Sequence, residues 1–314
     1  MKFAQLSDIH LMRSGACRCW WMTGDPDALL DKAIAQVNAI PDLDFVVFTG
    51  DLVDSADAGC FQQFQRIVSQ LRVPYYCSIG NHDYDDVPPA RTERDRFNRR
   101  DFLHWCSQQF FFKSAPTGFA DFSTSPLPGV RSIAIDASVG IHPEPQGVIR
   151  PEQLEWLQAE LDTHPRDLIV ILIHQPPLAS AFYRNHRILP SHAQPLCRIL
   201  NTHAHVAAVL SGHLHFPKAI ARHGTAYLTA PPLIGPVSAF RTIEIAAVDS
   251  PAAIARPVCG QLTYDWHPVR LSESGPTPLW HAFAMGRRKD RQGTMPVNLP
   301  ASWATAPEPA AAIA

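Results

Sequence analysis

The sequence predicts an α/β fold built on a sheet with parallel strands and helical crossovers. Strand-like and helix-like segments alternate through the first quarter of the chain, which is typical of parallel sheets. Short polar clusters also follow directly after apolar runs. Because the carboxyl ends of parallel strands meet at one edge of a sheet, where ligands bind, we expect these clusters to form one site.

The first predicted strand covers residues 3–6, and a loop over 11–26 follows it. Asp25 and Pro26 begin a helix, because aspartate is a good N-cap and proline suits the first helical position. The unbroken β-prone run 44–49 is typical of a strand covered on both faces. A helix near 57–70 and a strand over 73–79 complete the alternation.

Residues 84–112 change in character and are predicted to be mainly helical, in a segment that could cap the fold. Their arginines form either a solvated basic face or part of a cap that offers an arginine to a substrate phosphate, for which the planar guanidinium is suited. These arginines are Arg91, Arg94, Arg96, Arg99 and Arg100.

The rest of the chain predicts a second sheet. Its expected strands cover 119–122, 131–136, 168–173 and 206–210, with helices beginning at Pro151 and near 193–202. The runs 217–222, 225–229 and 241–247 are expected to complete this second sheet as an antiparallel meander. The pattern weakens from Pro251. We therefore predict a catalytic domain over 1–250 and a C-terminal extension over 251–314 that ends in a Pro- and Ala-rich tail.

The composition favours a soluble globular protein. The chain has 314 residues, of which 46% are hydrophobic and 18% charged, and a net charge of −2, so bulk charge gives no reason to expect a nucleic-acid polymer as partner. We see neither a secretory signal nor an apolar run long enough to span a bilayer. The seven scattered cysteines suit a reducing compartment, so we expect a cytoplasmic protein.

Five polar clusters carry the chemistry. They are Asp8-Ile9-His10, Gly50-Asp51-Leu52-Val53-Asp54, Gly80-Asn81-His82-Asp83, His174 and Gly212-His213-Leu214-His215. Carboxylates bind hard cations, and imidazole is a ligand for first-row transition metals. With 15 histidines in the chain, any one of them could be structural. Their repeated placement after apolar runs, however, predicts a metal site.

These motifs, in this order, resemble the calcineurin-like metallophosphoesterase superfamily over roughly residues 3–245. The resemblance implies a four-layer αββα sandwich with a dinuclear metal site at the carboxyl ends of the strands. By the same resemblance, Asp8, His10 and His215 would hold one metal, Asn81, His174 and His213 the other, and Asp51 would bridge both. His82 would be a catalytic histidine that is not a ligand, and Asp54 the acid that orients it.

The implied chemistry is hydrolysis of a phosphate ester. Two metal ions about 3.5–4 Å apart can clamp a phosphoryl group and acidify a bridging water, and the resulting hydroxide would attack phosphorus. An imidazolium at His82 could protonate the leaving alkoxide. The mixed O/N ligand set suits Mn and/or Fe, and Zn or Co would also fit.

Further residues narrow the branch of the superfamily. Ser55 stands where the Ser-Thr protein phosphatases carry arginine. The stretches 7–11, 47–52, 135–138 and 153–157 are instead similar to class III cyclic-nucleotide phosphodiesterases. Gln175 departs from that branch, which commonly has His-His-Pro-Pro where this chain has His174-Gln175-Pro176-Pro177.

We therefore expect hydrolysis of small phosphodiesters, above all 3′,5′-cyclic nucleotides. A phosphomonoesterase or nucleotidase, a glycerophosphodiester or 2′,3′-cyclic-nucleotide phosphodiesterase, and a non-catalytic protein-binding scaffold are the alternatives. Trp20, Trp21 and Tyr84 could stack a nucleobase or pack within a loop, and His142 could line the pocket. The C-terminal extension could pack on the site or on the partner subunit of a homodimer.

Overall fold

The computed structural model describes residues 1–12, 24–85, 97–138, 145–178, 185–248, 258–271 and 285–305. Two sheets form its centre. The first has the strand order β13-β12-β11-β1-β2-β3, with β1 Lys2–Leu6, β2 Phe45–Thr49, β3 Tyr75–Ser78, β11 Ala239–Ala247, β12 Val258–Pro268 and β13 Gly293–Leu299. The second has the order β4-β5-β6-β7-β8-β10-β9, with β4 Lys113–Ser114, β5 Phe122–Leu127, β6 Val130–Ile135, β7 Leu168–Ile173, β8 Val206–Ser211, β9 Lys218–Arg222 and β10 Thr225–Thr229.

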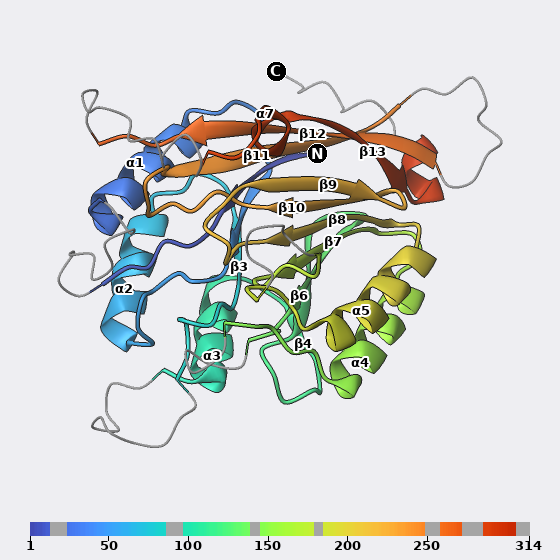
Figure 1. Ribbon diagram of the computed structural model, residues 1–314, viewed down its shortest axis with the longest axis horizontal. Coiled ribbons are helices and arrows are strands. Elements are labelled where there is room, and N and C mark those ends of the chain that lie inside the picture. The colour runs from blue at the N-terminus through green and yellow to red at the C-terminus, as the bar shows by residue number, and fades with distance from the viewer. Residues whose placement is uncertain are drawn as a thin grey trace.

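Helices cover the outer face of each sheet (Figure 1). Helices α1 (Pro26–Asn38), α2 (Ala58–Val68) and α3 (Arg99–Gln109) pack with the first sheet in one apolar cluster. Helices α4 (Pro151–Thr163) and α5 (Pro190–Thr202) pack with the second sheet in another. A third apolar cluster fills the space between the two sheets. The expected four-layer αββα sandwich is confirmed.

Local sequence explains where the first helices begin. The side chain of Asp25 accepts the backbone N–H of Asp27, and Pro26 takes the first helical position of α1. The side chain of Asp57 accepts the N–H groups of Gly59 and Cys60 at the start of α2. Both caps satisfy backbone donors that have no partner within the helix.

Parallel pairing brings the strand ends that matter to one edge. Strand β1 pairs in parallel with β2, and β2 with β3. In the second sheet, β6 pairs in parallel with β7, and β7 with β8. The segments that follow β1, β2 and β3 therefore emerge at one edge of the first sheet, and those after β7 and β8 at one edge of the second.

The prediction for the last strands was partly wrong. Strands β9 and β10 form an antiparallel pair in the second sheet, but β10 then pairs in parallel with β8. Strand β11 belongs to the first sheet, where it pairs antiparallel with β1. Its Ile243 and Ile245 lie in the apolar cluster between the sheets. Strand β11 lies in the first sheet because it pairs with the edge of β1, which is far from it in the sequence.

Much of the expected C-terminal extension is also part of the sandwich. Strands β12 and β13 pair antiparallel with β11 and with each other, and they extend the first sheet. A short helix, α7 (Arg288–Arg291), and a 3₁₀ turn, η2 (Ala301–Thr305), lie on either side of β13 in sequence. The tail beyond residue 305 lies outside the described residues.

Helix α3 occupies the part of the predicted cap segment that the structure describes. It packs into the apolar cluster of the first sheet through Phe102 and Trp105. Arg99 at its start donates from Nε to Oδ2 of Asp136 at 2.5 Å, so this arginine is engaged by a protein carboxylate. Arg91, Arg94 and Arg96 lie outside the described residues. No helix among the described residues is long and apolar enough to cross a bilayer.

Candidate metal centre

Four segments that follow strands are joined by hydrogen bonds at one edge of the sandwich. The backbone N–H of Ile9, after β1, donates to the carbonyl of Asp51, after β2, at 2.8 Å. The N–H of Gly212, after β8, donates to the carbonyl of His174, after β7, at 3.0 Å. These bonds link neighbouring strand ends within each sheet.

A further bond joins the two sheets at this edge. The N–H of His213 donates to Oδ1 of Asp8 at 2.9 Å, so a carboxylate from the first sheet holds the loop after β8 of the second. The polar clusters singled out in the sequence therefore lie together.

Asp8, His10 and His215 form the first group of donor atoms. Nε2 of His215 lies 3.3 Å from Oδ1 of Asp8 and 3.2 Å from Nε2 of His10. Their candidate ligand atoms all lie within 4.8 Å of one another, which is compact enough to hold one cation. Although burial opposes its ionisation, the imidazole of His215 lowers the pKa of Asp8 to about 2, so that Asp8 is a carboxylate.

Asp51, His174 and His213 form the second group. Nε2 of His174 lies 3.0 Å from Oδ2 of Asp51, while its Nδ1 hydrogen-bonds the carbonyl of Thr49 at 2.7 Å. The carbonyl can only accept, so it places a proton on Nδ1 and directs Nε2 into the site. Burial, together with the neighbouring His174, lowers the pKa of His213 to about 3, so this imidazole is neutral and can act as a ligand.

Asp51 lies between the two groups. Its Oδ2 is 3.0 Å from His174 Nε2 of the second group and 3.6 Å from His10 Nε2 of the first. Burial would raise the pKa of Asp51, but the surrounding imidazoles, His174 first, hold it well below its usual value. This arrangement is the one a bridging carboxylate needs.

The backbone is strained where these side chains are presented. Seven non-glycine residues of the described chain have positive φ, and five belong to the two groups: Asp8, His10, Asp51, His213 and His215, with φ between 49° and 69°. Such left-handed conformations cost about 1–3 kcal/mol each and gather at functional sites. Gly50 takes φ of 89°, and a Cβ there would lie 2.6 Å from His174 Nδ1. A side chain at position 50 would displace the imidazole.

Two buried atoms of the groups indicate that a cation fits. Among the described residues, Oδ2 of Asp8 and Nε2 of His213 find no hydrogen-bond partner although both are buried. Unpartnered buried polar atoms are unusual in a folded protein and call for an explanation such as a bound ion. A carboxylate and neutral imidazoles are the donors that first-row transition metals accept. The residues present therefore fit a metal centre.

Asn81 is buried, with 6% of its surface exposed. Its Oδ1 accepts a hydrogen bond from Nε2 of Gln175 at 3.4 Å. Its role as a ligand stays a prediction.

His82 is held at the rim of the site, with 26% of its side chain exposed. Its backbone N–H donates to Oδ1 of Asp51 at 2.9 Å, and its Nδ1 hydrogen-bonds the backbone carbonyl of Asp54 at 2.8 Å. Oδ1 of Asp54 is farther from that nitrogen, at 3.9 Å, and lies 3.5 Å from Nδ1 of His10. The main chain of Asp54 thus lies closer to the His82 ring than its carboxylate does, and the orienting role of Asp54 stays a prediction.

The motifs in the sequence did not predict a role for two residues near the site. Asp83, which the motif gave no role, is fully buried, and its two carboxylate oxygens accept the N–H groups of Leu52, Val53 and Gly80. It ties the loop after β2 to the loop after β3. His186 has its ring centroid 5.6 Å from that of His213 and is partly buried. No motif marks His186, whereas the adjacency of Asp83 to His82 could have been a signal.

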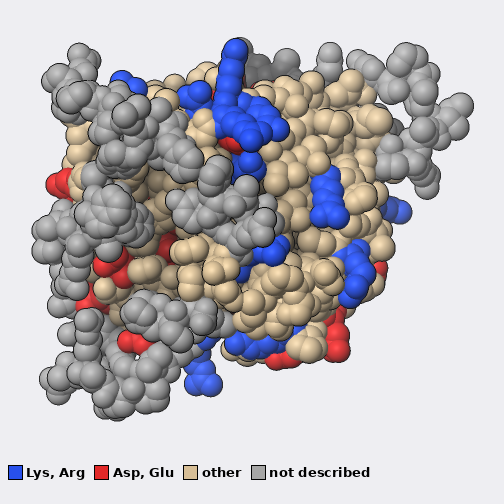
Figure 2. Space-filling model, viewed as in Figure 1, with Lys and Arg blue, Asp and Glu red and all other residues tan. Residues whose placement is uncertain are grey.

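Other candidates have different surroundings. Tyr84 is buried, and the Arg99 guanidinium stacks 3.9 Å from its ring centroid, which favours the packing interpretation over base stacking. Trp20, Trp21 and His142 lie outside the described residues. On the face seen in Figure 2, the described Lys and Arg side chains stand singly or in small groups, some of them beside Asp or Glu.

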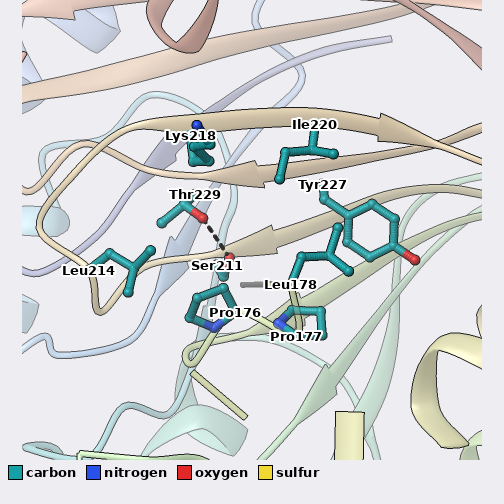
Figure 3. A pocket seen from close by; sticks show the side chains of 9 residues that line it. All are labelled: Pro176, Pro177, Leu178, Ser211, Leu214, Lys218, Ile220, Tyr227 and Thr229. Atoms are coloured by element: carbon teal, nitrogen blue, oxygen red, sulfur yellow. Dashed lines mark hydrogen bonds between the residues drawn. The ribbon is translucent and has the colours of Figure 1, made fainter. Parts of the chain in front are cut away.

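A small separate pocket lies beside the His213–His215 segment (Figure 3). It is lined by Pro176, Pro177, Leu178, Ser211, Leu214, Lys218, Ile220, Tyr227 and Thr229. Leu214 faces this pocket, whereas its neighbours His213 and His215 contact other histidines of the metal centre. None of the predicted ligands lines it, so this pocket is distinct from the candidate metal centre.

Known proteins resemble the chain in sequence and in fold. It is 30% identical to a cAMP/cGMP dual specificity phosphodiesterase of Mycobacterium tuberculosis over 67% of this chain and 60% of that protein. It is 26% identical to a probable glycerophosphodiester phosphodiesterase of Arcobacter nitrofigilis, over 68% of this chain and 72% of the relative. The fold is similar to that of a dimetal phosphatase from Danio rerio, with a TM-score of 0.63, 16% identity, and coverage of 86% of this chain and 99% of the other.

A protein-family model matches most of the chain. Residues 1–217 match the family model of the calcineurin-like phosphoesterases. This range holds all five polar clusters that the structure brings to one edge. The chain belongs to the calcineurin-like phosphoesterase family.

Proposed function

We propose that this protein is a metal-dependent hydrolase of small phosphodiesters, with 3′,5′-cyclic nucleotides as the first substrate class to test. The observation that carries the proposal is the pair of donor groups with Asp51 placed between them, together with the unpartnered buried atoms of Asp8 and His213. Relatives named as cyclic-nucleotide and glycerophosphodiester phosphodiesterases support the diester class.

The residues would divide the work as follows. Asp8, His10 and His215 would hold one ion, Asn81, His174 and His213 the other, and Asp51 both; Mn and Fe are our first choices. When bound, two such ions supply a clamp for the phosphoryl oxygens and an activated water. His82, outside this set, would give its proton to the leaving ester oxygen. The carbonyl of Asp54 holds the ring by Nδ1, which leaves Nε2 as the atom that carries the transferred proton.

The pKa of His82 agrees with a donor role. Burial lowers the pKa of His82. The carboxylate of Asp51 and the hydrogen bond to the Asp54 carbonyl raise this pKa by more than burial lowers it, so the net shift is upward from the ordinary value. A raised pKa favours the imidazolium near neutral pH, the form that can protonate an alkoxide.

A substrate panel tests this function. The protein is stripped with a chelator, reloaded in parallel with Mn²⁺, Fe²⁺, Zn²⁺ or Co²⁺, and given bis(p-nitrophenyl) phosphate or p-nitrophenyl phosphate. We expect the diester to be hydrolysed with the higher kcat/KM, and preference for the monoester would contradict the proposal. Then 3′,5′-cyclic AMP, 2′,3′-cyclic nucleotides and glycerophosphodiesters separate the diester classes. Asp51→Asn serves as the matched control, since it should lose metal and activity together.

We also propose a cytoplasmic protein. Cys77 and Cys106 are buried free thiols, which is in keeping with a reducing compartment. The homodimer stays a prediction, and size-exclusion chromatography with light scattering would test it.

A further inference from the structure

A buried chain of hydrogen bonds leads from an ion pair to Asn81. The Asp136 carboxylate binds Arg99 through Oδ2 and accepts the backbone N–H of Ser138 at Oδ1, at 3.0 Å. Oγ of Ser138 donates to Oε1 of Gln175 at 3.3 Å, and Nε2 of Gln175 donates to Oδ1 of Asn81 at 3.4 Å. Asp136, Ser138 and Gln175 are all at most 1% exposed. This chain of hydrogen bonds is therefore shielded from water.

The ion pair makes the start of this chain rigid. Arg99 also donates from Nη2 to the Tyr84 hydroxyl at 2.7 Å and to the Ser138 carbonyl at 2.8 Å. Gln153, a second buried glutamine, donates to Asp121 and to the carbonyl of Asp136. Ser138 is thus held through both its N–H and its carbonyl.

Gln175 packs against the backbone of Gly147. A Cβ at Gly147 would lie 2.9 Å from Cβ of Gln175, so the backbone at position 147 rests directly on this side chain. That backbone is fixed by a bridge to Ile188, whose own N–H donates to the carbonyl of Pro176 at 3.1 Å. Gln175 is thus buried against this backbone, with 1% of its surface exposed.

The direction of these bonds decides which end of the Asn81 amide is available to a metal. A side-chain amide can turn over and exchange its oxygen with its NH₂ group, and only the oxygen binds a cation. Gln175 presents a donor to Asn81, and a turned amide would place two NH₂ groups against each other. The carbonyl oxygen of Asn81 has two lone pairs, so it can accept the Gln175 bond and still face a metal.

We propose that Gln175 is a positioning residue, which holds the Asn81 amide with its oxygen toward the second metal. This inference rests on the proposed function, because it assumes that Asn81 is a ligand. Groups that hydrogen-bond a ligand typically change metal affinity about 10–100-fold when they are removed. Gln175 would thus position Asn81 from the place in the sequence where class III cyclic-nucleotide phosphodiesterases, which this chain resembles, commonly carry a second histidine.

Metal binding to the stripped protein tests the inference without relying on activity. Gln175→Met keeps the length of the side chain but removes the donor, and Gln175→His restores an N–H. Gln153→Met is the matched control, because it removes a buried amide whose hydrogen bonds go to Asp121 and the Asp136 carbonyl and not to Ser138, Gln175 or Asn81. Mn²⁺ titration calorimetry gives the two dissociation constants, and elemental analysis after dialysis gives the metal content.

We expect Gln175→Met to weaken one of the two sites about 10–100-fold, Gln175→His to recover most of that loss, and Gln153→Met to leave both sites unchanged. An equal loss in both sites, or the same loss in Gln153→Met, would mean a merely structural role and would overturn the inference. If Gln175→Met does not fold, Ser138→Ala removes the donor that orients Gln175 and should weaken the same site to a smaller degree; unchanged binding there counts against the inference.

Asn81→Ala separates this inference from the proposed function. If Asn81→Ala loses one metal while Gln175→Met binds two as before, the inference fails and the proposed metal site stands. If Asn81→Ala also keeps two metals with unchanged affinity, Asn81 is not a ligand, and both the ligand assignment and the inference fail.

Discussion

The backbone N–H of His82 donates a 2.9 Å hydrogen bond to Oδ1 of Asp51. The predicted bridging ligand and the predicted proton donor are therefore joined directly, although 31 positions separate them in sequence. Any shift of the Asp51 carboxylate moves the segment that carries His82. If Asp51 bridges the metals and His82 donates the proton, as proposed, this hydrogen bond would couple metal binding to proton transfer.

Replacing His82 by alanine should separate these two tasks. Because the hydrogen bond to Asp51 comes from the main chain, His82→Ala retains it and removes only the imidazole. We expect kcat for the diester to fall about 10²–10⁴-fold, the usual contribution of a positioned proton donor. Metal content should stay at the wild-type value.

The metal content of His82→Ala is informative because His82 also lies in a group with His10 and Asp51 that could hold a cation. Loss of a metal from His82→Ala would identify it as a ligand. His104→Ala, which removes an exposed histidine from α3, is the control and should change neither quantity.

Gly80→Ala should disturb the site through space alone. A Cβ at this position would lie 2.2 Å from the backbone nitrogen of Asp51 and 2.3 Å from its Oδ1. Backbone cannot yield as a flexible side chain can, so we expect a loss of about 1–3 kcal/mol in the free energy of unfolding. Weaker metal binding should accompany it. Urea unfolding and metal titration check both, and a variant that matches the wild type in each would contradict the expectation.

Asp83 should be essential to the stability of the loops after β2 and β3. Asp83→Ala leaves the N–H groups of Leu52, Val53 and Gly80 without their partner in a buried place, at about 1–3 kcal/mol for each group that stays unsatisfied. Asp83→Asn keeps one accepting oxygen and should lose about half as much. Urea unfolding of the metal-free proteins ranks the two variants; equal losses, or a loss below about 1 kcal/mol for alanine, would be inconsistent with this role.

Asp121 should make stability fall as the pH rises. Burial, and next the carboxylate of Asp136, raise its pKa from 3.8 to about 6 in the folded protein. Between these two values the folded state binds more protons than the unfolded state, so the free energy of unfolding decreases from about pH 4 to about pH 6.

Asp121→Asn removes this titration. Relative to the variant, the wild type should lose on the order of 2–3 kcal/mol across that interval. Urea unfolding at several pH values, with a chelator present so that metal release does not contribute, measures the difference. Parallel pH curves for the two proteins would disprove the assignment.

The sequence was most informative where strong local patterns coincide with the site. The apolar runs of β1, β2, β3, β7 and β8 are unambiguous, and a polar cluster follows each of them. Parallel pairing then makes convergence of the clusters at the strand ends a geometric consequence. For this reason, Asp8, Asp51 and His174 could be predicted as site residues from a single sequence.

The sequence was least informative about strands with partners far away along the chain. Strand β11 alternates like an antiparallel strand, but nothing in its residues tells whether β1 or a strand of the second sheet will accept it. Strands β12 and β13 join the first sheet only because β11 leaves an edge for them. Long-range pairing of this kind is decided by which edge is available.

The residue types of the candidate metal centre, their order and their place after buried strands could be predicted from the sequence, because strand periodicity and donor chemistry are local properties. How those side chains are held depends on the fold. In the folded protein the carbonyl of Asp54 hydrogen-bonds His82, Asp83 joins two loops, and Gln175 contacts Asn81. These contacts join residues far apart in the chain and depend on backbone conformations, including the positive φ of Asp8 and Asp51, that packing of the two sheets imposes.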